Sequence, residues 1–242
     1  MDSVIQPTGM PMFINNDAAF RMGALSSALV PIFRGRFCDY LLSNRAARTF
    51  DEDEVIYELG GKERTLFFIR RGVVKTGTTT SRGREIIYDL RKDGDVVGEL
   101  AAMESVRRDR AVAVEPTEAV PVAFDEVVDA LALHPTLLPD FIGIFCGALS
   151  EAYDQVNRMA ADNVMDGLVN VLRGLASKLG RSSGELIEIS AYLTQEEISQ
   201  MVVARRERVS TALNSLRRRG IVRYSARGHL LLDVRALERH SS

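Results

Sequence analysis

Cysteine and histidine are scarce in this chain of 242 residues, and their scarcity excludes two kinds of site. Cys38 and Cys146 are too few to supply the set of thiolates that an iron–sulfur cluster normally takes. Both are expected to be free thiols in a reducing compartment. The histidines lack the spacing of metal ligands and stand at three scattered positions: His134, His229 and His240. We therefore expect neither a metal site nor an iron–sulfur cluster.

Long apolar runs and a secretion signal are also missing. No stretch approaches the length of a membrane span. The opening residues MDSVIQPTGMPMF lack the basic start and the apolar stretch of a signal peptide. The hydrophobic content of 46% and the charged content of 26% are ordinary for a soluble globular protein. We expect a cytoplasmic protein of one large domain or two modest ones, without membrane contact.

Signatures of catalysis are missing as well. The sequence shows no nucleophile–base pair, no metal cluster and no Walker-type loop. We therefore expect a binding protein and not an enzyme.

The most informative stretch is LTQEEISQMVVARRERVSTALNSL, residues 193–216, which predicts two helices joined by a tight turn. Thr194 and Glu197 form the capping box that starts the first helix, Gln195–Val202. The second helix, about Arg205–Arg218, has apolar residues at helical spacing on one face and basic or polar residues on the other. Such a pair predicts a helix-turn-helix, whose second helix enters the major groove of DNA.

The polar face of the second helix and the start of the first supply the candidate DNA contacts. Arg206 is suited to a bidentate contact with guanine, and Glu207 to accepting a hydrogen bond from cytosine. The remaining candidates would contact phosphates or neighbouring bases: Thr194, Gln195, Arg205, Arg208, Ser210 and Thr211.

The residues after this helix pair strengthen the prediction. Ile221–Tyr224 and His229–Asp233 flank a short turn and predict the hairpin of a wing. From Ala191 to Ser242 there are ten Lys and Arg against five Asp and Glu, a net charge of roughly +5. The whole chain carries −2, so the remainder is acidic. A basic module on an acidic body indicates nucleic acid as a partner.

The preceding part of the chain shows two kinds of sequence pattern, one typical of strands and one typical of helices. Short β-type runs at even spacing between Arg48 and Phe124 predict an antiparallel barrel or sandwich, with Ser81–Arg84 as one hairpin tip. Helices around Phe20–Leu29 and Phe37–Asn44 are expected to be packing elements.

The longest helical stretch is Thr136–Met159. Its apolar residues recur every three or four positions, which predicts a coiled-coil seam but also fits ordinary core packing. The seam would consist of Ile142, Phe145, Leu149, Ala152, Val156 and Met159. A connecting helix is expected at Asp162–Lys178, followed by a flexible turn at Gly180–Gly184.

These patterns resemble the cyclic-AMP receptor protein / FNR superfamily of bacterial transcription regulators, from about residue 48 to 239. Matches in the DNA-binding part are Leu-Thr-x-x-Glu-Ile from Leu193, Arg206-Glu207, Val209-Ser210, Leu213, Leu216 and the Arg-Gly-Ile that ends at Ile221. Matches in the β-type part are Phe67-Phe68-Ile69, Gly72, Gly83-Arg84-Glu85, Gly94-Asp95 and Gly98-Glu99-Leu100.

The resemblance implies an α+β fold in three parts. Residues 1–134 would be an antiparallel β-roll sensor, a jelly roll like those that bind cyclic nucleotides, with helices at its N-terminus. Residues 135–161 would be a dimerisation helix, and residues 162–242 a winged helix-turn-helix. The implied partners are a second copy of the chain, double-stranded DNA with a pseudo-palindromic site, and RNA polymerase.

Three departures from the family pattern affect the helix-turn-helix. Val203 replaces the usual turn glycine, and we expect a turn without a left-handed residue there. Arg205 replaces the usual Ser or Thr N-cap, so the second helix lacks a side-chain acceptor at its start. Thr211 replaces a second base-reading arginine of many members, so the preferred DNA sequence should differ.

The resemblance also implies a ligand site. In cyclic-nucleotide binders Gly-Glu-Leu opens a phosphate-binding cassette that ends in an arginine. An ungapped match puts Asp109 at the arginine position, whereas a one-residue insertion would put Arg110 there. The helix hydroxyls that contact the purine are replaced by Ala152 and Tyr153. The candidate ligand contacts are Gly98, Glu99, Leu100, Arg108, Arg110 and Tyr153.

We therefore expect no cyclic-AMP binding in the usual mode. Another cyclic nucleotide, another small-molecule effector, and activity without an effector remain open. The alternative function is a nucleotide-sensing β-roll that controls a partner protein rather than DNA.

Overall fold

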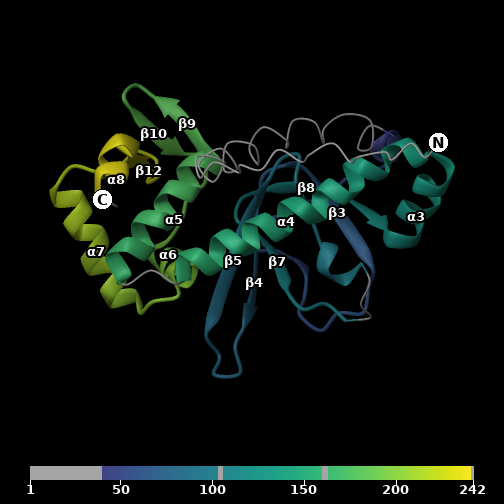
Figure 1. The fold of residues 1–242 in the computed structure, drawn as a ribbon, viewed down its shortest axis with the longest axis horizontal. Coiled ribbons are helices and arrows are strands. Elements are labelled where there is room, and N and C mark those ends of the chain that lie inside the picture. The colour runs from purple at the N-terminus through teal and green to yellow at the C-terminus, as the bar shows by residue number, and fades with distance from the viewer. Residues whose placement is uncertain (1–39, 103–105, 160–162, 241–242) are drawn as a thin grey trace, which may run out of the picture.

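The computed structural model describes residues 40–102, 106–159 and 163–240, which form two lobes connected by a long helix (Figure 1). The helix predicted around Phe20–Leu29 lies outside the described residues, as does the start of the helix predicted at Phe37–Asn44. Tyr40–Leu42, within the second of these predictions, are helical.

The first lobe is the predicted antiparallel β-roll. Its strands pair in two four-stranded sheets, with the orders β1-β8-β3-β6 and β2-β7-β4-β5. Every pairing in these sheets is antiparallel. The strands are β1 Arg48–Phe50, β2 Val55–Tyr57, β3 Thr65–Arg71, β4 Val73–Thr79, β5 Glu85–Lys92, β6 Val96–Val97, β7 Arg110–Ala113 and β8 Thr117–Ala123.

Four helical segments lead from the roll to the second lobe. They are α3 Phe124–Leu133, the 3-10 turn η2 Pro135–Leu137, α4 Leu138–Met159 and α5 Val164–Leu179. Helix α3 ends before Pro135, because the residue before a proline is pushed out of the helical conformation. The Asn163 side chain caps α5 by accepting hydrogen bonds from the backbone N–H groups of Met165 and Asp166. The long helix and the connecting helix predicted from the sequence are thus both present, with a break between them.

The hydrophobic sequence of β3 is explained by burial on both of its faces. Leu66 and Phe68 pack under α3 and the start of α4. Phe67 and Ile69 point into the roll, where Tyr57 also lies. A sheet covered on both sides has a continuous apolar run instead of alternation.

The second lobe contains the predicted helix-turn-helix and wing. Its elements are β9 Gly180–Ser183, β10 Leu186–Ile189, α6 Gln195–Val202, α7 Arg206–Arg218, β11 Val222–Tyr224, β12 Leu230–Leu232 and α8 Val234–His240. The strands form one sheet with the order β11-β12-β10-β9. The hairpin β11–β12 is the predicted wing, closed by a hydrogen bond from Ser225 N to the carbonyl oxygen of His229 at 2.8 Å.

The prediction of a flexible turn at residues 180–184 was wrong. Residues 180–183 form strand β9, which pairs antiparallel with β10. Position 180 requires glycine, because a Cβ there would lie only 2.1 Å from the carbonyl oxygen of Ala176 at the end of α5 and would clash with it. Gly184, with φ +65°, forms the tip. The glycines thus serve close packing and a hairpin turn instead of a linker.

The two lobes share one hydrophobic cluster. Val73, Ile87, Leu90 and Val114 of the roll belong to the same buried cluster as Leu168 of α5. A shift of α5 against the roll must therefore break apolar contacts as well as polar ones.

None of the described helices is long and apolar enough by itself to cross a membrane. Residues Phe124–Leu133 and Pro135–Val156 meet that criterion only as a pair, which is bent by 116°.

Candidate DNA-binding and effector sites

Helix α6 starts with the predicted capping box. The Thr194 hydroxyl accepts a hydrogen bond from Glu197 N at 3.1 Å, and Glu197 Oε2 accepts one from Thr194 N at 2.9 Å. These bonds satisfy two backbone N–H groups that a helix start otherwise leaves unpaired. Ile198 and Met201 are buried on the inner side of the helix.

The turn between α6 and α7 corrects a second prediction. Val203 has φ +56° and ψ +36°, so it is left-handed although it is β-branched. Its N–H, like that of Ala204, donates to the carbonyl oxygen of Ser199. The tight connection between two packed helices requires this conformation, and tertiary packing offsets a strain of about 1–2 kcal/mol.

Helix α7 separates its two faces as predicted. Val209, Leu213 and Leu216 are fully buried, and Ala212 is nearly so. Arg205 is the N-cap and makes no side-chain capping bond, as expected from its chemistry. The polar face carries the candidate DNA contacts, with Arg205, Arg206, Glu207, Arg208 and Thr211 exposed and Ser210 half-buried.

Arg206, the candidate contact to guanine, is accessible to a partner. Its side chain is 63% exposed, and its nearest carboxylate oxygen, on Glu196, lies 3.9 Å away. An exposed ion pair at this distance contributes little, so the guanidinium is free to contact a partner. Thr211 Oγ1 donates to the carbonyl oxygen of Glu207 at 2.9 Å, which engages that hydroxyl within the helix. At the start of α6, Thr194 is exposed and Gln195 half-buried.

The second candidate site lies in the roll, at the turn η1 Glu99–Ala101. Gly98 precedes it with φ +92°, and a Cβ there would lie 2.7 Å from the carbonyl oxygen of Thr65 and 2.8 Å from Arg107 Nη1. Only glycine fits this position. Glu99 is buried, and its Oε1 lies 3.3 Å from Arg91 Nη2.

The buried arginine of this cassette is Arg107, which sequence reasoning did not single out. Its side chain is only 1% exposed. The guanidinium lies 3.9 Å above the ring centroid of Tyr57, and Nη2 donates to the carbonyl oxygen of Thr65 at 2.7 Å. Its Nε and Nη1 find no hydrogen-bond partner within the part of the chain that the structure describes. Buried N–H groups without partners are rare and mark a strained or functional position.

Asp109 adds a carboxylate beside this arginine. Tyr57 donates its hydroxyl to Asp109 Oδ2 at 2.9 Å, while Oδ1 has no partner among the described residues. Burial raises the pKa of Asp109 to about 6, and the nearby charge of Glu99 acts in the same direction. Burial, followed by the charges of Asp109 and Glu99, also raises the pKa of Tyr57.

The other predicted ligand contacts are not gathered in this interior. Arg108 is exposed, and Arg110 forms long ion pairs with Glu58 at 3.3 Å and Glu85 at 3.4 Å. Leu100 is 48% exposed and Tyr153, on α4, is 61% exposed. The structure therefore brings Gly98 and Glu99 together with Arg107, rather than with Arg108 or Arg110.

Five charged side chains from four elements meet where the two lobes join. Lys178 of α5 lies 2.7 Å from Asp89 Oδ2 and 2.8 Å from Glu151 Oε1. Arg91 Nε lies 2.9 Å from Asp89 Oδ2. The other Arg91 nitrogens lie 3.3 Å from Glu99 and from Glu151. This junction cluster forms a continuous chain of ion pairs from the cassette through β5 to α4 and α5.

The junction cluster contains a group that titrates near neutral pH. Burial raises the pKa of Glu151 to about 7, and the neighbouring carboxylate of Asp89 adds to this effect. Burial alone would raise the pKa of Asp89, but Lys178 and Arg91 outweigh it and lower that pKa. The same carboxylates outweigh burial at Lys178 and raise its pKa. Protonation at the junction therefore falls mainly on Glu151.

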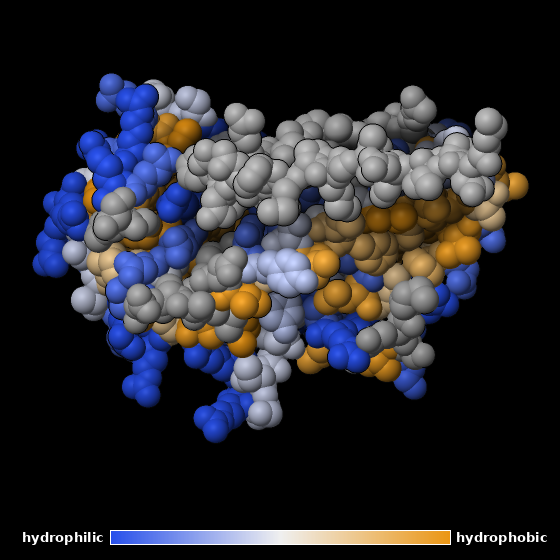
Figure 2. Space-filling model, viewed as in Figure 1, coloured by the Kyte–Doolittle hydropathy of each residue, from blue (hydrophilic) through white to orange (hydrophobic). Residues whose placement is uncertain are grey.

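Helix α4 carries an exposed apolar face. Figure 2 shows apolar side chains gathered on the face of the molecule that α4 crosses. Phe145 of the predicted seam turns inward and meets Phe141 edge to face, with ring centroids 5.2 Å apart, and Met159 is the last helical residue. Cys146 is exposed. The other exposed residues that bear on the seam are Leu138, Ile142, Leu149, Ala152, Tyr153 and Val156.

Comparison with known proteins matches both lobes. A family described as cyclic nucleotide-binding domain matches residues 47–134, and the Crp-like helix-turn-helix domain matches residues 168–240. The chain is 26% identical over 193 residues to a CRP-like cAMP-activated global transcriptional regulator of Mycobacterium tuberculosis, covering 79% of this chain and 86% of that protein. It is also 26% identical over 172 residues to a global nitrogen regulator of Synechocystis sp., covering 70% and 76% respectively.

The solved structures agree with these matches at the level of the fold. FixK2 from Bradyrhizobium japonicum superposes with a TM-score of 0.71 at 20% identity, covering 82% of this chain and 98% of that one. The fold and the two domain matches define a transcription regulator with a cyclic nucleotide-binding domain and a helix-turn-helix. The chain belongs to the Crp/Fnr superfamily.

Proposed function

We propose that the chain acts as a dimer and reads a pseudo-palindromic DNA site with helix α7. The observation that carries this proposal is the exposed start of α7, with Arg206 at 63% exposure on a helix whose opposite face is buried. A two-fold dimer would place two such helices in successive major grooves, about 34 Å apart. Arg206 and Glu207 would contact bases, and the remaining polar residues would contact phosphates.

The exposed apolar face of α4 supports dimerisation through that helix. Ile142, Leu149 and Val156 are each more than half exposed, although side chains of this kind are normally covered. We divide the chain as the sequence predicted, into a sensor at residues 1–134, a dimerisation helix at 135–161 and a DNA-binding part at 162–242.

A small-molecule effector is suggested by the cyclic nucleotide-binding domain itself. We place its site at Gly98, Glu99 and Arg107, because Arg107 offers two buried N–H groups in need of an acceptor. The carboxylate of Asp109 in the same interior disfavours cyclic AMP in the usual mode. Calorimetry with a panel of cyclic mono- and dinucleotides tests this site, and binding of cyclic AMP alone would contradict the proposal.

The DNA function is tested with Arg206→Ala. A site is first selected from random duplexes, and binding to it is compared with binding to a scrambled duplex. The variant should lose about 1–3 kcal/mol of sequence discrimination but keep weak, salt-sensitive binding. Arg218→Ala, at the far end of the same helix, is the control and should keep the preference. Equal weakening on both duplexes would refute base contact by Arg206.

The dimer is tested through Cys146, which stands between Ile142 and Leu149 on the exposed face of α4. In a parallel two-fold seam each Cys146 faces its counterpart, so mild oxidation of a Cys38→Ser protein should give a covalent dimer. Cys146→Ser should abolish the cross-link. Sedimentation as a monomer at micromolar concentration would sink the dimer proposal.

A further inference from the structure

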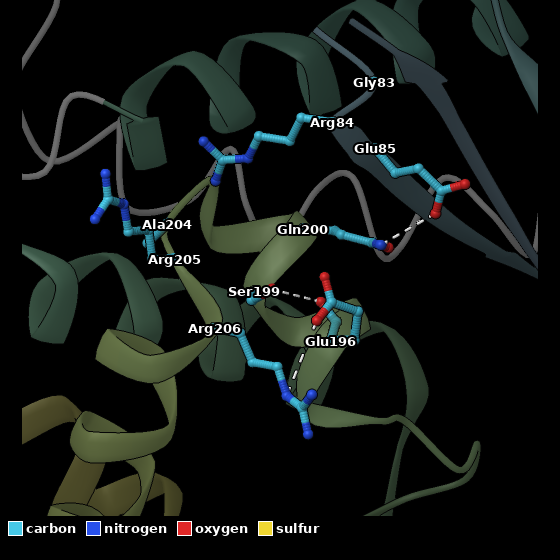
Figure 3. A pocket seen from close by; sticks show the side chains of 9 residues that line it. All are labelled: Gly83, Arg84, Glu85, Glu196, Ser199, Gln200, Ala204, Arg205 and Arg206. Atoms are coloured by element: carbon cyan, nitrogen blue, oxygen red, sulfur yellow. Dashed lines mark hydrogen bonds and ion pairs between the residues drawn. The ribbon is translucent and has the colours of Figure 1, made fainter.

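A groove separates the β4–β5 hairpin of the sensor from the helix-turn-helix, and it has a volume of about 510 Å³ (Figure 3). One wall is the hairpin tip and the other is formed by α6, the turn and the start of α7. Its lining residues are Gly83, Arg84, Glu85, Glu196, Ser199, Gln200, Ala204, Arg205 and Arg206.

Two polar contacts hold the hairpin beside α6. Gln200 Nε2 donates to Glu85 Oε2 at 3.1 Å. Lys75 Nζ lies 2.7 Å from Oε1 of Glu197, whose carboxylate also completes the capping box of α6. The position of the hairpin tip is therefore coupled to the helix that supports the start of α7.

The two glutamates of the groove have polar partners, whereas two of its three arginines form no ion pair among the described residues. Glu85 contacts Gln200 and Arg110, and Glu196 lies near Arg206. Within the described ranges, Arg84 and Arg205 form no ion pair, and both side chains are exposed. In Figure 3 the Arg84 side chain extends from the hairpin toward the Ala204–Arg205 turn, while Arg206 points toward Glu196.

The tip of the hairpin is exposed. Gly83 has φ +75°, and a Cβ built on it would meet nothing within 4 Å. The space beside Gly83 is therefore free of described protein atoms, and the neighbouring Arg84 is exposed.

We propose that the β4–β5 hairpin is a second DNA-contact surface, in which Arg84 and Arg205 together hold one backbone phosphate beside the bases contacted by α7. Guanidinium groups suit phosphate oxygens because they donate in a planar fork. This inference rests on the proposed function, since it assumes that α7 lies in the major groove.

The balance of charge favours a phosphodiester over a free polyanion. Three arginines and two glutamates line the groove, which leaves one net positive charge. One positive charge matches the single negative charge of a backbone phosphate, whereas inorganic phosphate or a nucleotide with a terminal phosphate group brings more. The sensor would then touch DNA directly, and phosphate contacts of this kind set position without reading sequence.

The test measures the salt dependence of DNA binding in the full-length protein. Affinity for the selected duplex and for a scrambled one is measured across a series of KCl concentrations. Each lost phosphate contact lowers the slope of log K against log salt by about 0.9, so Arg84→Ala should lower it by about 1.8 per dimer. The ratio of affinities for the two duplexes should not change. Arg84→Lys, which keeps the charge, should keep most of the slope.

Arg82→Ala is the matched control, because Arg82 lies in the same hairpin tip but does not line the groove. An unchanged slope for Arg84→Ala, or an equal decrease for Arg82→Ala, would overturn the assignment to the groove. Arg206→Ala, measured in the same series, reports separately on α7 through the affinity ratio. If the native protein shows no preference between duplexes, the proposed function fails and the hairpin contact fails with it. Inorganic phosphate that competes with DNA in the native protein but not in Arg84→Ala would assign the groove to free anions instead.

Discussion

Two buried arginines, Arg91 at the junction of the lobes and Arg107 inside the roll, have opposite surroundings. Arg91 lies within 3.3 Å of three carboxylates, those of Asp89, Glu99 and Glu151. Arg107 is more deeply buried, but its polar contact is a single backbone carbonyl, supplemented by the face of Tyr57.

This difference gives the two arginines different roles: the charge of Arg91 stabilises the structure, and the charge of Arg107 is available to a ligand. The cost of burying Arg91 is offset by its ion pairs, which also tie the cassette to α4 and α5. The cost of burying Arg107 is only partly offset, because Nε and Nη1 are unpaired among the described residues. An anionic effector group could complete the contacts of Arg107, whereas the charge of Arg91 is already balanced by three carboxylates, although its Nε also lacks a well-aligned hydrogen bond among the described residues. Both arginines approach Gly98–Glu99, so an effector that moves Glu99 would disturb the junction cluster.

The largest expected effect comes from Arg91→Met. The change leaves Asp89 and Glu151 with Lys178 as their remaining cation in the cluster and removes the ion pair of Glu99, so the free energy of unfolding should fall by about 3 kcal/mol. Urea denaturation at neutral pH measures this loss. Arg91→Lys, which retains one charge, should lose less. A loss below about 1 kcal/mol for the methionine variant would mean that the junction cluster contributes little to stability.

A smaller effect is expected from Glu151→Gln, and it should depend on pH. The folded protein holds a proton on Glu151 up to about pH 7, whereas the unfolded chain releases it near the ordinary glutamate pKa of 4.5. The unfolded state therefore binds fewer protons in this interval, and the free energy of unfolding falls as pH rises through it. In Glu151→Gln the free energy of unfolding should no longer fall between about pH 6 and 7. The expected difference from the native protein is about 1 kcal/mol per pKa unit.

Asp109 provides the internal comparison for this measurement. The pKa of Asp109 is raised to about 6. Its ionisation therefore also lowers the free energy of unfolding as pH rises, but over a more acidic interval than that of Glu151. Urea unfolding between about pH 5.5 and 8 resolves the two contributions. Parallel pH curves for the native protein and Glu151→Gln would show that Glu151 does not titrate as the junction geometry requires.

The smallest effect is expected from Arg107→Met, despite the deeper burial of this arginine. Methionine keeps the packing on Tyr57 and removes the unpaired N–H groups, so the change in stability should stay within about 1 kcal/mol. The same urea measurement checks it. A loss as large as that of Arg91→Met would erase the contrast between the two arginines and assign both to structure.

The sequence predicted those elements whose cause is local. The capping box of Thr194 and Glu197, the apolar stripe of α7 and the wing all depend on residues close together in the chain. Each appears in the structure as predicted, because capping, helical periodicity and turn chemistry act over a few residues.

Predictions failed where distant contacts decide the outcome. Val203 is left-handed because the packing of α6 on α7 overrides its local preference. Strand β9 forms because β10 pairs with it, although its own composition is typical of a loop.

The candidate effector site shows the same limit. Arg107, Arg108 and Arg110 are equivalent by composition. Backbone pairing of Arg107 with the Gly60–Gly61 turn, at 2.8 and 2.9 Å, selects which one points inward. The junction cluster could not be predicted from the sequence either, since its members are spread over 90 residues from Asp89 to Lys178.

Strand β9 is the last strand of the second lobe's sheet, its outer edge is unpaired among the described residues, and all four of its residues are exposed. An unpaired edge invites pairing with the same edge of another molecule, but this one presents Arg181 and two serines in place of β-branched apolar residues. Mutual repulsion of the arginines discourages sheets of neighbouring molecules from joining. Replacing Arg181 with valine would therefore lower the concentration at which the protein aggregates.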